Sequence, residues 1–145
     1  MNTAKSDVEL VLNSVLPFAE EMLVKHGEFF PFGGAMQPDG EILHVNTWDG
    51  DERPASNDVI AVLTREFKSG AERGDYKATA IVYDILTVPP GKIEKQDAIA
   101  IALDHRNDYS VVVVYPYSFD ANDQLAIQSP FASKGGGEIF SQTTE

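Results

Sequence analysis

Three histidines, His26, His44 and His105, are the side chains of this sequence best suited to chemistry near neutral pH. Neutral imidazole is the commonest metal ligand and the usual general base in that range. Glu28 follows His26 by two residues, and Asp104 directly precedes His105. No two histidines have the close spacing of known metal motifs, so a site requires that the fold bring these residues together. One hypothesis is therefore a small-molecule-binding or metal-assisted enzyme that uses these five residues.

Each histidine also has a structural interpretation, which we favour. His26 falls in the last turn of a predicted helix, where a cation interacts favourably with the helix dipole. His44 occupies an alternating strand position, and His105 opens a predicted hairpin turn. Residues 104–108 are all polar, more than a hairpin turn requires. This turn is either a solvated loop or a small recognition tip.

A second polar segment follows the single tryptophan, Trp48, which has three carboxylates within the next four residues. An indole that is buried at the entrance of the next helix would belong to the core. An exposed indole would be a protein-binding anchor. The sequence leaves both alternatives open. The binding candidates from the two polar segments are Trp48, Asp49, Asp51, Glu52, Asp104, His105 and Arg106.

Sequence motifs of common cofactor and metal sites are missing. There is no phosphate-binding glycine loop, no dinucleotide-binding glycine motif, no hydrolase nucleophile elbow and no paired-histidine zinc motif. Residues 135–137 are three glycines with no helix predicted after them, which indicates a linker. Asp49 and Asp51 have the spacing of a calcium loop, but the required glycine and glutamate positions do not match. We therefore expect no cofactor and no metal ion.

The composition is typical of one globular domain. The chain has 145 residues, of which 43% are hydrophobic, and it contains no cysteine. The missing cysteine excludes disulfides, thiolate chemistry and zinc sites built on sulfur. The first residues are polar, unlike a signal peptide, and the longest apolar run, residues 111–114, is too short to span a bilayer. We predict a cytoplasmic protein with a single domain over residues 1–130 and a flexible tail over 131–145.

The net charge constrains the class of partner. The 11 basic and 23 acidic residues give a formal net charge of −12. Nucleic acids and anionic membranes require clustered cations, and here no three cations are adjacent. We expect neither of these partners. Excess negative charge instead favours a protein partner with a basic surface.

Two helices are predicted from apolar residues at helical spacing. The first begins with a capping box at residues 6–9, is interrupted by a kink or break near Asn13 and Ser14 because of Pro17, and ends at Gly27. The second begins with Ser56 as its cap and ends at Gly74. Its predicted buried stripe consists of Ile60, Leu63, Phe67 and Ala71.

Strands are predicted over residues 28–36, 42–47, 77–88, 98–105, 110–117 and 124–128. A turn at residues 37–40 joins the first two, and Pro31 indicates that the first is an edge strand or carries a bulge. Pro116 has no amide hydrogen, so it should end strand pairing.

The strand over residues 98–105 is apolar on both faces, with alanines on one side and larger residues on the other. Such a strand must be covered on both faces. Either the two helices take opposite faces, or one face is buried in a homodimer. The order of elements predicts an α+β fold with a mainly antiparallel sheet of about five strands and two helices. This order resembles the profilin-like and roadblock-like sandwiches.

Four segments carry a resemblance to a known group. Residues 26–33, Asp39–Gly40, residues 104–106 and residues 115–117 are similar to motifs of small bacterial domains of unknown function. The resemblance spans residues 8–120 and implies a bacterial origin and a single domain. Many bacterial immunity proteins have a similar size and acidity. We therefore favour a non-catalytic, protein-binding domain of the immunity or chaperone kind over the enzyme hypothesis.

Overall fold

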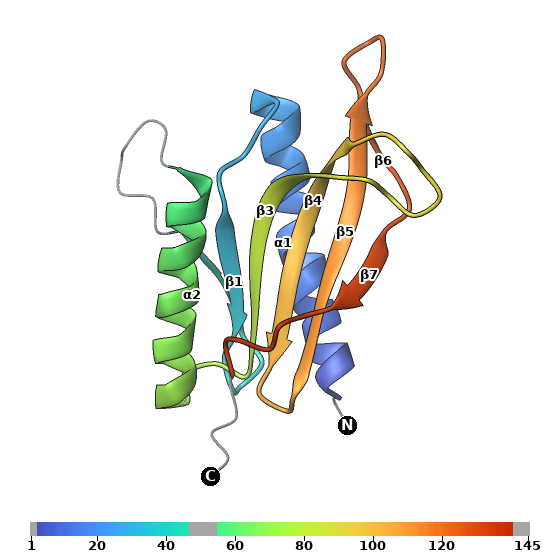
Figure 1. The fold of residues 1–145 in the computed structure, drawn as a ribbon. Coiled ribbons are helices and arrows are strands. Elements are labelled where there is room, and N and C mark those ends of the chain that lie inside the picture. Colours follow the sequence, from blue (N-terminus) through green and yellow to red (C-terminus); the bar gives the residue numbers. More distant parts are fainter. Residues whose placement is uncertain (1–2, 47–54, 141–145) are drawn as a thin grey trace.

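The computed structural model describes residues 3–46 and 55–140, and it confirms the predicted fold class. Two helices and a seven-stranded antiparallel sheet make up these residues (Figure 1). The strand order is β2-β1-β3-β4-β5-β6, and β7 also pairs with β5. The elements are α1 (Ala4–His26), β1 (Phe32–Met36), β2 (Ile42–Val45), α2 (Ser56–Arg73), β3 (Ala78–Thr87), β4 (Gln96–His105), β5 (Tyr109–Phe119), β6 (Leu125–Ile127) and β7 (Phe131–Lys134).

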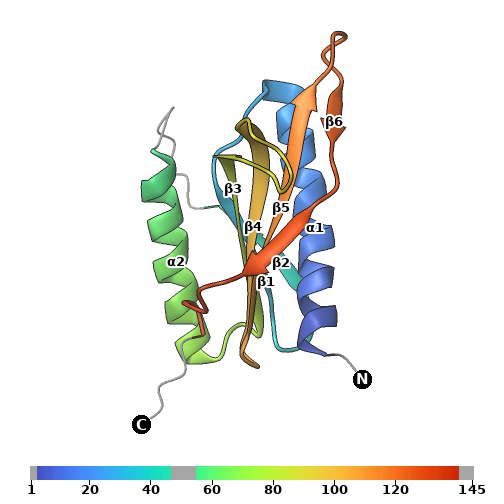
Figure 2. The ribbon, with the colours of Figure 1, turned by 45° about the vertical axis from the view of Figure 1, so that its right-hand side comes forward.

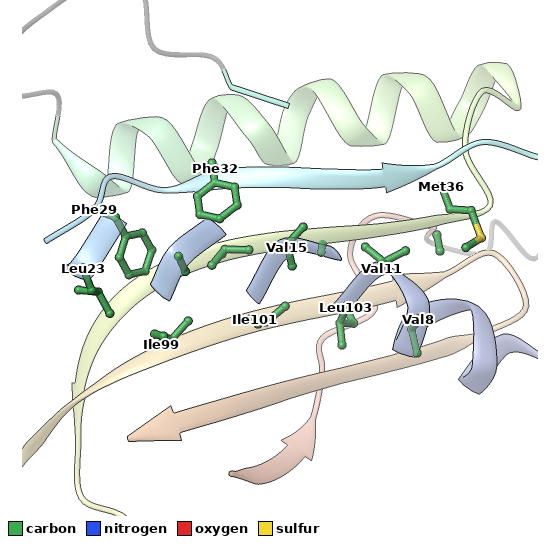
Figure 3. Close-up of a cluster of buried hydrophobic side chains, with 14 of the residues drawn as sticks. Val8, Val11, Val15, Leu23, Phe29, Phe32, Met36, Ile99, Ile101 and Leu103 are labelled. Atoms are coloured by element: carbon green, nitrogen blue, oxygen red, sulfur yellow. The ribbon is translucent and has the colours of Figure 1, made fainter. Parts of the chain in front are cut away.

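The two helices cover opposite faces of the sheet, as Figure 2 shows. α1 packs on β1, β3 and β4, and α2 packs on β1 and β3. The helices thus take opposite faces of the sheet, as in the first of the two alternatives, but α2 does not cover β4. The alanine face of β4, with Ala98 and Ala100, packs instead with Val114, Tyr83 and Phe131 of neighbouring strands. The larger core cluster lies between α1 and the sheet (Figure 3). Its helix side consists of residues at regular spacing along one stripe: Val8, Val11, Val15, Ala19 and Leu23.

Two glycines in β1 allow both helices to approach the sheet. A Cβ atom at Gly33 would lie 2.6 Å from the Phe67 ring of α2. A Cβ atom at Gly34 would lie 2.5 Å from Val15 of α1. The prediction that this strand is an edge or carries a bulge was wrong, because β1 lies between β2 and β3 and pairs with both in continuous register. Pro31 precedes the strand, so its missing amide interrupts no ladder bond.

The first helix begins one turn earlier than predicted. Thr3 is the N-cap, and the side chains of Thr3 and Ser6 bond each other's backbone amides. The helix continues through Pro17 to His26 without a break. The earlier start places Asp7 inside the helix, where its side chain is buried.

The second helix also differs at its start. Ala55 is the N-cap and makes no side-chain cap bond, so Ser56 is the first helical residue and not the cap. Its buried residues are Val59, Leu63, Phe67 and Gly70. Gly70 leaves room for the Tyr76 ring, since a Cβ there would lie 2.2 Å from that ring.

Pro116 separates two pairings of one continuous strand. Strand pairing was predicted to end at Pro116, and β5 itself continues through Pro116 to Phe119. The ladder with β4, however, has its last pair at Ala98 and Pro116. Beyond it, β5 pairs with β6 from Tyr117 onward. The missing amide thus coincides with a change of partner strand.

The segment after residue 130 is packed where the structure describes it, although the sequence predicted a flexible tail. Phe131–Lys134 forms β7, and Ile139 is buried beside α2. The Gly135 amide donates to the Ser110 carbonyl, and the Gly137 amide donates to the Ser110 Oγ. Two apolar side chains among glycines and serines are thus enough to anchor this segment. Residues 141–145 lie outside the described residues.

A search for transmembrane helices over the described part of the chain finds none that is long and apolar enough to cross a membrane.

Replacement of Gly34 by Ala should destabilise the fold, because the new methyl group overlaps Val15 in a packed core. We expect a loss of about 1–3 kcal/mol in the free energy of unfolding, measured by urea denaturation. Gly136→Ala is the control, since its Cβ would have only ordinary contacts, at 3.6 Å or more. Equal stabilities of the two variants would show that β1 and α1 do not pack as closely as described.

Candidate functional site

An apolar pocket lies between the C-terminal half of α1, the segment that leads into β1, and the end of β2. Its volume is about 350 Å³. Phe32 meets the rings of Phe18 and Phe29 edge to face, with centroids 4.9 and 6.1 Å apart. Phe29 and Phe32 are themselves buried, so core packing fixes this wall. The lining residues are Phe18, Met22, His26, Glu28, Phe29, Phe30, Pro31, Phe32 and Asn46.

The three histidines do not share this pocket. His26 lines it together with Glu28. His44 lies beside it, where its Nε2 is 2.9 Å from the Ser14 Oγ and its ring meets Phe18 at 5.9 Å. His105 contacts Asp7 near the other end of α1, about 28 Å away at 1.5 Å per helical residue. Within residues 3–46 and 55–140, no three His, Asp or Glu side chains are grouped so that they could hold a metal ion.

Glu28 of the pocket lining and Asp97 both act electrostatically on a third carboxylate, that of Asp84. Asp84 accepts a hydrogen bond from the Tyr117 hydroxyl, 3.0 Å from each carboxylate oxygen. Burial raises the pKa of Asp84, the Tyr117 bond lowers it, and the charges of Asp97 and Glu28 raise it further. Glu28, one of the charges that raise the pKa of Asp84, also lines the pocket, whereas Asp84 and Asp97 are not among the residues that line it. Burial and the Asp84 charge raise the pKa of Tyr117 in turn.

The predicted recognition tip at residues 104–106 is mostly buried. Asp104 and His105 are only 8% and 2% exposed and, as consecutive strand residues, face opposite sides of the sheet. Arg106 is exposed. Burial raises the pKa of Asp104, whereas a hydrogen bond with Ser110 lowers it. Asp104 and His105 therefore cannot form an exposed tip in this conformation.

His105 instead belongs to a buried polar cluster that the sequence interpretation missed. Its Nε2 lies 2.9 Å from the Asp7 Oδ2, and the Lys77 Nζ lies 3.6 Å from the same oxygen. The sequence does carry a signal for Asp7, since it precedes Val11 by four residues and so continues the buried stripe. The predicted capping box at residues 6–9 places Asp7 outside that stripe.

The other predicted binding residues, Trp48, Asp49, Asp51 and Glu52, lie outside the described residues. Asn46, which lines the pocket, is the last described residue before them.

Comparisons with protein-family models, curated proteins and solved structures find no match to this chain. The resemblance to small bacterial domains, and that to profilin-like and roadblock-like sandwiches, therefore remain predictions. Most of the first resemblance motif, residues 26–33, nevertheless lines the pocket.

Asp84→Asn should stabilise the protein at neutral pH. The raised pKa of Asp84 means that the unfolded chain releases this proton more readily than the fold does. The wild type therefore loses stability as the pH rises from about 3.8 through the folded pKa, and the Asn variant does not. Thermal melting at several pH values should give a higher melting temperature for the variant than for the wild type. This difference should grow as the pH rises over this range. A difference in melting temperature that does not change with pH would contradict the raised pKa of Asp84.

Proposed function

We propose that this protein is a non-catalytic, acidic protein-binding domain of the bacterial cytoplasm, of the immunity or chaperone kind, and that the apolar pocket receives a side chain of a basic partner. The observation that carries the proposal is the pocket itself, which joins an aromatic wall to the exposed carboxylate of Glu28. The missing cysteines suit a reducing compartment.

The pocket has the properties of an anchor site. Its volume of about 350 Å³ is at the small end of the range for ligand pockets, a size that suits one large apolar side chain. Side chains that fill such pockets carry much of the binding energy of protein interfaces. Because Phe29 and Phe32 are held by the core, little ordering entropy is lost when a partner binds.

The interacting carboxylates of Glu28, Asp84 and Asp97 support a basic partner. Burial and the charges of Asp97 and Glu28 raise the pKa of Asp84 and so disfavour its charged form. A Lys or Arg side chain that lands beside the pocket would relieve this repulsion and form charge-assisted hydrogen bonds. The formal net charge of −12 also opposes self-association and attracts basic proteins over longer distances.

The enzyme hypothesis has less support from the geometry. Of its five residues, only His26 and Glu28 line the pocket. His105 and Asp104 are buried elsewhere, and His44 bonds Ser14 outside the pocket.

The test places a photo-reactive benzoylphenylalanine at Phe18, which lines the pocket, and separately at Leu10 on the same helix. Both positions are partly exposed, at 37% and 50%. In a bacterial lysate, the Phe18 probe should capture a basic protein that the Leu10 probe does not. Phe18→Ser should then weaken binding of that purified partner by about tenfold or more, through faster dissociation, while Leu10→Ser should not. Equal capture at both positions, or equal affinities, would refute a pocket-centred interface.

The acidic segment that follows Trp48 in the sequence gives a second, kinetic prediction. Replacement of Asp49, Asp51 and Glu52 by Ser should slow association with the basic partner and reduce its salt dependence. Charges at an interface rim steer the encounter more than they hold the complex, so dissociation should change little. Stopped-flow measurements at several salt concentrations separate the two rates.

The matched control removes three carboxylates from the α2 side of the sheet. Glu66, Glu72 and Asp75 are exposed, and their replacement by Ser changes the net charge by the same amount. If both triple variants slow association equally, net charge alone steers the partner and the three acidic residues after Trp48 have no special role.

A further inference from the structure

Both ring nitrogens of His105 have partners. Nε2 lies 2.9 Å from the Asp7 Oδ2, and Nδ1 lies 3.0 Å from the backbone nitrogen of Asn107. A backbone amide can only donate, so Nδ1 is the acceptor and carries no proton. The ring is therefore neutral, and its single hydrogen sits on Nε2 and is donated to Asp7.

The charged groups around the ring are already balanced without a further proton. From α1, Asp7 faces the ring, and its charge is matched by Lys77, which lies just before β3 at 3.6 Å from the same carboxylate oxygen. Tyr109 of β5 is the cross-strand partner of His105. The ring and Asp7 are 2% and 3% exposed. A proton on Nδ1 would add a positive charge that water cannot reach.

The turn after His105 uses this acceptor together with two backbone bonds, one of which joins the Arg106 amide to the Lys77 carbonyl at 3.0 Å. Its residues 106–108 carry two exposed charged groups, Arg106 and Asp108, and Asp108 has a left-handed backbone with φ of 64°. The Asp108 amide bonds the His105 carbonyl at 3.2 Å, and the Asn107 amide bonds the ring. In an Asx turn, the side-chain oxygen of Asn or Asp accepts a hydrogen bond from the backbone amide two residues later. The His105 imidazole accepts the same kind of bond here.

We propose that His105 is an acid-sensitive latch between the first turn of α1 and the hairpin turn that joins β4 to β5. When Nδ1 gains a proton, it becomes a donor and faces the Asn107 amide, which is also a donor. The turn bond then breaks, and the ring must reach water for its charge to be solvated. The turn at residues 106–108 opens, and the contact of His105 with Asp7 is exposed. The latch lies near the opposite end of α1 from the pocket, so it is independent of the proposed binding function.

The test is NMR of the full chain between pH 8 and pH 5, with the imidazole nitrogens and the Asn107 amide observed together. At pH 8 the His105 ring should show the neutral form with its hydrogen on Nε2. On acidification, protonation of Nδ1 should coincide with a fall in the hydrogen-exchange protection factor of Asn107. We expect a fall of about tenfold, which corresponds to one net hydrogen bond of ~1.4 kcal/mol.

Two variants each keep one of the two bonds and do not titrate. His105→Asn supplies an oxygen near the Nδ1 position, so Asn107 should stay protected at both pH values. His105→Gln supplies a donor near the Nε2 position but no acceptor for the turn, so Asn107 should be unprotected at both. The wild type should resemble the Asn variant at pH 8 and the Gln variant at pH 5.

Three results would overturn the latch. They are a ring protonated on Nδ1 at pH 8, an Asn107 protection factor that does not change when the ring gains its proton, and a ring that stays neutral until the whole chain unfolds. The wild-type measurement alone decides among these results, even if one variant fails to fold.

Discussion

The fold depends on one packing contact, in which every fourth residue of α1 faces the sheet. The row begins at Asp7, continues through Val11, Val15 and Ala19, and ends at Leu23, and all five are buried. Side chains four residues apart lie along one ridge of a helix, so this row needs a flat, close surface opposite it. Gly34 provides that surface by leaving space for Val15. On the other face, Gly33 does the same for Phe67 of α2.

The packing of α1 on the sheet also positions the buried Asp7 cluster and the apolar pocket. At the N-terminal end of the ridge, the helix carries Asp7 into the core, where His105 and Lys77 are its partners. Near the C-terminal end, Phe18 and Met22 leave the sheet and form one wall of the pocket. Phe29 to Phe32, in the segment that turns from α1 into β1, extend this wall, since the Phe32 ring contacts the Phe18 ring. Because the core holds this wall, the pocket exists before any partner binds.

The sequence predicted the helices and strands well where apolar spacing dominates and the turn residues are standard. It predicted β3, β4 and β5 closely, because their alternating or continuous apolar runs are long. It failed where tertiary packing overrides a local signal. Pro31 indicates an edge strand only if it lies inside the strand, and Pro17 indicates a break only if packing does not hold the helix. Phe131 and Ile139 have no periodicity, so nothing local showed that they are packed.

The candidate site was harder to predict, since it consists of residues that meet only in space. His26 and Glu28 were singled out from sequence and do line the pocket, but the aromatic wall around them was interpreted as part of a strand. Asp84 was not noticed at all, because an acid in an alternating strand is ordinary until burial and two neighbouring charges raise its pKa. His105 was singled out for the wrong reason, because a polar turn suggested exposure and not a buried contact with Asp7.

Hydrogen-exchange mass spectrometry of the protein with and without its captured basic partner tests the central claim most directly, because it locates the interface without any substitution. If the pocket receives the partner, exchange should slow in residues 18–32, with little change in α2 or in the β4–β5 hairpin. Slower exchange confined to α2 or β7, with residues 18–32 unchanged, would contradict the account.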